Sequence, residues 1–232
     1  MKEYKQDNLT IYNADCMEIM SRYEDNYFDL AVVDPPYGIG ADKAQNKAGE
    51  SREKAKGLSK SGRGWVKYKE TSWDDYVPDE NYFIELFRVS KTQIIWGGNY
   101  FENLWSKSNS FIVWDKKQRE FSLADGELAW YSKSYKAMRT FDLSRAEALH
   151  NNNETGGRFH PTQKPVKLYN WIYKNYAKEG QKILDTHLGS GSNAISAHYA
   201  KMGEFVGCEL DKDYYEASIK RIYNETRQLE LF

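Results

Sequence analysis

The sequence predicts an α/β fold, a doubly wound and mostly parallel sheet with helices on both faces. Short runs of β-branched and aromatic residues alternate with helical segments along most of the chain, the order that builds a parallel sheet layered by helices. One run, "FDLAVVD" at 28–34, is apolar almost throughout, as expected of a central strand that is covered on both faces. These two observations carry the prediction of the fold class.

The individual elements follow from the same patterns. Strands are expected at 9–15, 28–34, 92–98, 110–116 and 127–133, and within 181–192 and 203–211. Helices are expected at about 79–90, 165–178, 193–202 and 212–228. In the last of these, Tyr215, Ile219 and Ile222 recur at the three- and four-residue spacing of a helix face. The segments 40–75 and 134–159 give no clear element.

The composition is that of a soluble globular protein. The chain has 232 residues, 40% hydrophobic and 29% charged, and we expect one domain over 1–232. No apolar run approaches the roughly 20 residues that span a bilayer, and the polar start "MKEYKQDN" is not a signal peptide. Cys16 and Cys208 are too few for a disulfide framework or a metal cluster, so we expect buried free thiols in a cytosolic protein.

The strand at 28–34 runs directly into Asp34-Pro35-Pro36-Tyr37. Neither proline can donate a backbone hydrogen bond, so the pair ends the sheet ladder. What remains at the strand tip is a stiff turn that holds a carboxylate beside an aromatic ring. Taken alone, the turn is explained equally well as a strand end with a capping Asp.

A second strand, within 181–192, leads into a glycine–serine turn and then a helix. Gly189 and Gly191 allow a tight turn and a close approach to a ligand. Glu209 falls at the tip of the next strand, where an acidic residue binds ribose hydroxyls in nucleotide-binding folds. The pattern G-S-G-S is not G-x-G-x-x-G, which disfavours a pyrophosphate. A nucleoside with an amino-acid tail suits the turn better, with Asp185 able to reach the ammonium of the tail.

Together, the turn at 34–37 and the glycine turn followed by Glu209 resemble the S-adenosylmethionine-dependent amino-methyltransferases of DNA. Their order along the chain is similar to that of the circularly permuted β class. "HPTQKPVKLYNWI" at 160–172 is similar to the motif of that class beside the cofactor, and "NADCMEIM" at 13–20 to its acidic motif that contacts adenine. The resemblance covers most of the chain outside about 40–75 and 134–158. It implies a Rossmann-like methyltransferase fold and a bacterial or phage origin.

The resemblance also implies the cofactor and the residues that bind it. The cofactor is S-adenosyl-L-methionine, the product is S-adenosyl-L-homocysteine, and no metal is needed. The implied cofactor residues are Asp15, Cys16, Asp34, Pro35, Thr162, Lys164, Asp185, His187, Gly189, Ser190, Gly191, Ser192, Asn193, Glu209 and Leu210. The family usually has Phe at the position of His187 and Thr-Thr at Ser192-Asn193, which leaves details of cofactor packing open.

The implied catalytic residues are Asp34, Pro35, Pro36 and Tyr37. An exocyclic amine is a poor nucleophile because its lone pair is delocalised into the base. The Asp34 carboxylate and the Pro35 carbonyl accept its two N–H groups, and the base stacks on Tyr37, so that the amine can attack the methyl group in line. A base in a duplex must first be flipped out. Asp rather than Ser at the first position resembles the adenine-N6 branch more than the cytosine-N4 branch.

Positive charge is concentrated between positions 43 and 69, with nine Lys and Arg against Glu50 and Glu53, a balance of 9 − 2 = +7. We expect a mobile basic loop at about 40–75 that contacts the phosphates of double-stranded DNA. Its expected DNA contacts are Lys43, Lys47, Arg52, Lys54, Lys56, Lys60, Arg63 and Lys67. The segment at about 134–159 is a second candidate for recognition of the target sequence.

Other interpretations stay open at this point. Within enzymes they are methylation of cytosine N4, of RNA or of a protein glutamine. A catalytically inactive nucleic-acid-binding subunit with the same fold is the alternative from another class, and a dinucleotide oxidoreductase is disfavoured by the missing third glycine. The sequence is compatible with a homodimer and with a restriction endonuclease partner but indicates neither. We expect the cytoplasm of a bacterial cell, with the gene on the chromosome, a phage or a mobile element.

Overall fold

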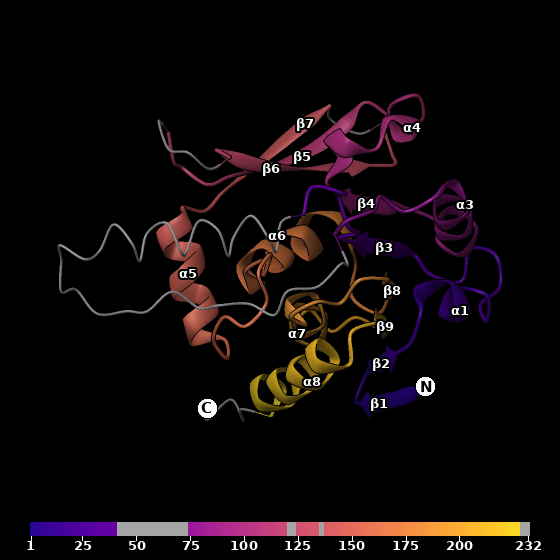
Figure 1. Ribbon diagram of the computed structural model, residues 1–232, viewed down its shortest axis with the longest axis vertical. Helices are drawn as coiled ribbons and strands as arrows, with labels where there is room; N and C mark the ends of the chain where they lie inside the picture. Colours follow the sequence, from indigo (N-terminus) through magenta and orange to yellow (C-terminus); the bar gives the residue numbers. More distant parts are fainter. Residues whose placement is uncertain (41–73, 120–123, 135–136, 228–232) are drawn as a thin grey trace.

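The computed structural model describes residues 1–40, 74–119, 124–134 and 137–227, and every structural statement below refers to these residues. Their strands form one nine-stranded sheet in the order β1-β2-β9-β8-β3-β4-β6-β5-β7 (Figure 1). The strands are β1 (Lys2–Gln6), β2 (Leu9–Asn13), β3 (Leu30–Val33), β4 (Gln93–Trp96), β5 (Ser110–Asp115), β6 (Gly126–Tyr131), β7 (Met138–Asp142), β8 (Lys182–Asp185) and β9 (Glu204–Glu209).

The strands β2, β9, β8, β3 and β4 are all parallel, which confirms the expected parallel core of the sheet. β1 is antiparallel to β2, and β6 is antiparallel to both β4 and β5, while β5 and β7 run parallel. The carboxyl ends of the five central strands therefore meet at one edge of the sheet. The first residues of β6, Gly126 and Glu127, lie at this same edge because β6 runs the other way.

Helices cover both faces, as the sequence predicts. α6, α7 and α8 lie on one face, and α1 and α3 on the other (Figure 1). The helices are α1 (Cys16–Met20), α3 (Glu80–Val89), η2 (Gly98–Tyr100), α4 (Glu102–Trp105), α5 (Arg145–Glu154), α6 (Val166–Tyr176), α7 (Ser192–Tyr199) and α8 (Lys212–Thr226). Among the described residues, no helix is both long enough and apolar enough to cross a membrane.

The hydrophobic core consists of two layers, one on each face of the sheet. β3 is buried throughout and contributes to both, with Leu30 and Val32 in one layer and Ala31 and Val33 in the other. Successive side chains of β3 point to opposite faces of the sheet, and both faces are buried. The sequence therefore shows a continuous apolar run here and no alternation of apolar and polar residues. The tip of β3 is therefore held rigidly between two packed helical layers.

Every strand and helix expected from the sequence is present, with ends that differ by a few residues. The sequence did not predict β1 at the sheet edge, the short helices α1, η2 and α4, or β7 and α5 inside the unassigned segment 134–159. α5 begins with a capping box, in which the Ser144 hydroxyl accepts from the Glu147 N–H and the Glu147 carboxylate accepts from the Ser144 N–H. The predicted basic loop at 40–75 lies almost wholly outside the described residues.

Candidate active site

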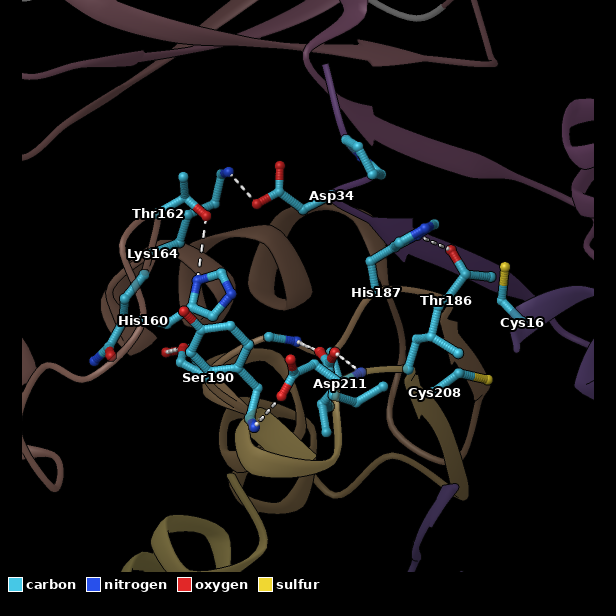
Figure 2. Close-up of a pocket in the computed structure, with 18 of the residues that line it drawn as sticks. Cys16, Asp34, His160, Thr162, Lys164, Thr186, His187, Ser190, Cys208 and Asp211 are labelled. Carbon is cyan, nitrogen blue, oxygen red and sulfur yellow. Dashed lines mark hydrogen bonds and ion pairs between the residues drawn. The ribbon is translucent and has the colours of Figure 1, made fainter. Parts of the chain in front are cut away.

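A cavity of about 380 Å³ opens at the carboxyl edge of the sheet, in front of β2, β3, β8 and β9 (Figure 2). Most of the predicted cofactor residues line it. These are Asp15, Cys16, Asp34, Thr162, Lys164, His187, Gly189, Ser190, Ser192, Glu209 and Leu210. Pro36 is also in the wall; it belongs to the turn Asp34-Pro35-Pro36-Tyr37, called the catalytic turn after its predicted role. Segments that are far apart in the sequence thus meet in one pocket, as the strand-tip argument predicts.

The Glu209 carboxylate is held at the tip of β9 by two backbone groups. One of its oxygens accepts from the N–H of Gly189 and the other from that of Asp211, both at 2.9 Å. Burial raises the pKa of Glu209 to about 7. Gly189 has φ +54°, and a Cβ there would come within 3.6 Å of the His160 ring. The acid that we expect to bind ribose is therefore tied to the glycine turn itself.

Pro35, Tyr37, Asp185, Gly191 and Asn193 are the predicted residues outside the pocket wall. The buried Asp185 carboxylate accepts from the His187 N–H at 3.1 Å and from Asn193 Nδ2 at 2.9 Å, and burial raises its pKa to about 7. Because Asn193 Nδ2 also donates to the Val32 carbonyl at 3.0 Å, this pair joins β8, α7 and β3 behind the pocket. That Asp185 contacts the ammonium of the cofactor's amino-acid tail stays a prediction.

Gly191 precedes α7 with φ +77°, a backbone conformation that favours glycine. An added Cβ would lie 2.9 Å from Ile222 Cδ1. The close approach at this glycine is therefore to α8.

Two histidines in the pocket wall are neutral. Burial lowers the pKa of His187 to about 4 and that of His160 to about 3. The His187 ring meets Tyr82 edge-on, and the His160 ring meets Tyr214 edge-on with centroids 4.4 Å apart. Sequence reasoning did not select His160 or Tyr214, although His160 opens the motif at 160–172. Their rings give the pocket flat, uncharged surfaces.

A row of paired charged side chains begins at Asp34 and continues away from the catalytic turn. One oxygen of Asp34 accepts from the Tyr37 hydroxyl. The other accepts from Lys164 Nζ (Figure 2). The Lys164 side chain is 3% exposed and also pairs with Glu127 at 3.2 Å, and Glu127 pairs with Lys116 at 2.6 Å. Burial raises the pKa of Asp34 against the effect of Lys164. Burial alone would raise the pKa of Glu127 as well, but Lys164 and Lys116 bring it down to about 2.

The ring of Tyr37 lies beside the turn that follows β4. It stacks against Tyr100 with ring centroids 5.1 Å apart and an interplanar angle of 15°. Gly97 has φ +72°, and a Cβ at this position would come within 2.2 Å of the Tyr37 ring. Gly97 therefore leaves the space that the ring occupies.

Asp74 anchors the catalytic turn, and sequence reasoning missed it. Its side-chain oxygen accepts from the N–H of Tyr37 at 2.6 Å and from that of Gly38 at 3.1 Å, and its carbonyl accepts from the N–H of Gly40 at 3.0 Å. Asp74 is 1% exposed. Thirty-seven positions separate Asp74 from Tyr37, so no local spacing marks it as a partner.

Asp74→Ala is expected to reduce methyl transfer without weakening cofactor binding. The variant removes the acceptor of two part-buried N–H groups and so frees the Tyr37 peptide to move; a hydrogen bond to a charged group is worth roughly 1.5–3 kcal/mol at most at such a site. Asp74→Asn keeps an acceptor oxygen and should retain most of the activity. The measurement is single-turnover transfer together with calorimetric cofactor binding. Equal losses in the two variants would show that the charge of Asp74, and not its acceptor geometry, matters.

Cys16 and Cys208 are free thiols at the pocket wall. Burial raises the pKa of Cys16 to about 12, so its thiol stays protonated. The residues predicted to contact DNA, from Lys43 to Lys67, all lie outside the described residues.

Comparison with known proteins identifies a family for this chain. The N6/N4 methyltransferase family, described as DNA methylase, matches residues 28–220. The Type II methyltransferase M2.MboI of Moraxella bovis is 26% identical, over 94% of this chain and 88% of that protein.

Two solved structures share the fold. The M1.HpyAVI–SAM complex has a TM-score of 0.57 and 17% identity, with 92% of this chain and 99% of that one covered. The cytosine-N4-specific PvuII DNA methyltransferase has a TM-score of 0.59 and 12% identity, covering 96% of this chain and 93% of that one. Since the family match spans most of the chain and includes the turn at 34–37, the glycine turn and Glu209, the chain belongs to the N6/N4 family of DNA methylases.

Proposed function

We propose that this chain transfers a methyl group from S-adenosylmethionine to N6 of adenine in a specific sequence of double-stranded DNA. The observation that carries the proposal is Asp34-Pro35-Pro36-Tyr37 at the tip of β3, with Asp34 and Pro36 in the wall of an acidic pocket. When bound, S-adenosylmethionine supplies an electrophilic methyl group on a sulfonium. The chain has to bind this cation, hold the base and orient the amine.

The pocket suits a cationic nucleoside. Asp15, Asp34, Glu209 and Asp211 line it, and Lys164 is the one Lys or Arg among the described residues of its wall. Because Lys164 is already paired with two carboxylates, a phosphate would find no unpaired cation there. The volume of about 380 Å³ is in the usual range for small-molecule sites. We infer that Glu209 binds the ribose hydroxyls and that His160 and His187 pack against the ligand.

The catalytic turn supplies acceptors for the amine. The Asp34 carboxylate and the Pro35 carbonyl each accept a hydrogen bond from one N–H of the amine. Together they hold the nitrogen with its lone pair toward the methyl group. The Tyr37 ring supports the base. Positioning and fixed dipoles account for the rate in this scheme, and no covalent enzyme intermediate is involved.

Asp34 favours adenine over cytosine as the target, while the fold itself does not decide, since the PvuII enzyme is cytosine-N4-specific. The test is incubation of the chain with labelled S-adenosylmethionine and duplexes that contain or lack adenine, followed by digestion and identification of the modified nucleoside. We expect N6-methyladenine alone. Label in N4-methylcytosine would overturn the choice of base, and no label in DNA would overturn the proposed function. Sequencing that detects modified bases, in DNA from cells that express the chain, identifies the target sequence.

Glu209→Ala is expected to raise the cofactor Kd. A hydrogen bond to a charged acceptor is worth roughly 1.5–3 kcal/mol, which corresponds to about a 10- to 150-fold weaker complex. Calorimetry with S-adenosylmethionine measures the change. Glu216→Ala, which removes an exposed acid of α8 paired with Lys2, is the matched control. An unchanged Kd in Glu209→Ala would remove Glu209 from the site.

Target recognition requires contacts beyond this pocket. We propose that the segment 134–159, with β7 and α5, and the basic segment at 40–75 approach the duplex. The first borders the carboxyl edge of the sheet, and the second follows the catalytic turn in sequence. We further propose that the chain is one catalytic domain that acts in a bacterial cytoplasm. A homodimer and a restriction endonuclease partner stay predictions.

A further inference from the structure

Both oxygens of the Asp34 carboxylate accept a hydrogen bond before any base arrives. Tyr37 donates to one of its oxygens and Lys164 to the other. The function proposed above, on which this inference rests, requires Asp34 to accept an N–H of the target amine. An ammonium on the same carboxylate neutralises its charge and weakens it as an acceptor. The amine therefore meets the full charge of the carboxylate only if the ammonium withdraws.

Lys164 has a second acceptor within reach, while among the described residues the Tyr37 hydroxyl donates to Asp34 alone. Lys164 Nζ lies 3.2 Å from Glu127 Oε2, and the Lys164 side chain is 3% exposed. If this ammonium moved into water, the Asp34 and Glu127 carboxylates would lose its charge, and leaving such charges uncompensated is costly. We therefore expect Lys164 to move only between acceptors that are already present. Besides Asp34, Lys164 Nζ has the Tyr37 hydroxyl at 3.4 Å and Glu127 at 3.2 Å as acceptors, and of these two only Glu127 carries a negative charge to match the ammonium.

The charges around Lys164 balance whether its ammonium pairs with Asp34 or with Glu127. Asp34 and Glu127 are two carboxylates, and Lys164 and Lys116 are two ammonium groups. Lys116 occupies the other oxygen of Glu127, so Glu127 attracts Lys164 without capturing it outright. Glu127 is fixed in β6, whose antiparallel course brings its first residues to the edge where β3 ends.

We propose that Glu127 is a positioning residue that takes over the Lys164 ammonium when the target base enters, which releases one oxygen of Asp34 to accept the amine N–H. No bond forms or breaks in this exchange, and no proton is transferred. Glu127 acts only through Lys164 and does not touch the base.

The test is single-turnover methyl transfer at saturating DNA and cofactor. Glu127→Gln keeps the size of the side chain but removes its charge, so Lys164 should stay on Asp34 and the rate should fall about 10- to 100-fold, with an unchanged cofactor Kd. Glu127→Asp should recover much of the rate. Glu85→Gln, which removes the charge of a half-buried acid paired with Arg88 at 2.8 Å in α3, is the matched control and should leave the rate unchanged.

A double-mutant cycle tests the route through Lys164. If Glu127 acts only on Lys164, then Glu127→Gln should add nothing in a Lys164→Gln background. Lys116→Gln removes the competing cation from Glu127 and should not slow methyl transfer. This variant provides a test even if Glu127→Gln does not fold.

Wild-type rates in Glu127→Gln would overturn the role of Glu127 alone, since methyl transfer itself would stand. Three further results would overturn that role in the same way. They are additive losses in the double variant with Lys164→Gln, a slow Lys116→Gln variant, and a Glu127→Gln variant that changes only the cofactor Kd. A wild-type chain that transfers no methyl group to DNA would overturn the proposed function and this role together.

Discussion

Asp34→Ala is expected to reduce methyl transfer by about a thousandfold or more, because it removes the acceptor that acts on the amine in the transition state. Cofactor binding should remain mostly intact, since the Glu209 and glycine-turn contacts do not involve Asp34. The variant should also fold. Lys164 loses one partner but keeps Glu127 at 3.2 Å, so the buried ammonium is not left alone.

A matched control lies just before the other end of the same strand. Asp29 precedes β3 and pairs with Lys91 at 2.7 Å, so Asp29→Ala also removes an acid with a lysine partner, but at the amino edge of the sheet, opposite to the edge that carries the pocket. Its transfer rate should match that of the wild type once both proteins are shown to be folded. Turnover of Asp34→Ala within about tenfold of the wild type would contradict the proposed mechanism, since an acceptor that acts in the transition state typically contributes about 100-fold or more.

Local patterns in the sequence predict the parts of this site that depend on one stretch of chain. Two prolines after an apolar run fix a strand tip whatever surrounds it, and Gly189 with Glu209 follows from strand order and spacing. The parallel order of β3, β8 and β9 then brings their tips to one edge without further information. The catalytic turn and the pocket could therefore be predicted together.

Contacts that depend on register could not be predicted. Glu127 reaches Lys164 only because β6 pairs antiparallel to β4, with Trp96 opposite Ala129. In the sequence, Glu127 is one acid in a half-buried strand, and nothing there distinguishes it from a solvated charge. Asp74 is similar, since its role as acceptor for the Tyr37 N–H depends on how the chain returns after 73.

Edge elements were missed for a different reason. β1 has one apolar position, Tyr4, among Lys and other polar residues, and β7 alternates between exposed and half-buried positions. Such strands bury little apolar surface, so hydrophobic patterning is weak where pairing with a neighbour decides the structure. The amphipathic signal of α5 is weak for the same reason, and a capping box is its clearest mark.

Tyr37→Ala is expected to weaken binding of the flipped base by about 1–3 kcal/mol, the usual worth of a base stacked on an aromatic side chain. The ring is available for this role because Gly97 leaves it space and Tyr100 supports it by stacking. The loss should be seen in the affinity for a duplex that carries the target sequence, with cofactor Kd unchanged. Tyr76→Ala, at a tyrosine that is 79% exposed, controls for loss of a surface ring.

Tyr37→Phe separates the ring from the hydroxyl. Phe keeps the stacking surface and loses the hydrogen bond to Asp34, so DNA affinity should stay near that of the wild type. Its transfer rate should change less than that of Tyr37→Ala, because Phe keeps the ring that holds the base beside Asp34. Equal damage to DNA affinity in both variants would show that the base is held through the hydroxyl. The stacking role of Tyr37 would then be wrong, while the role of Asp34 as acceptor would stand.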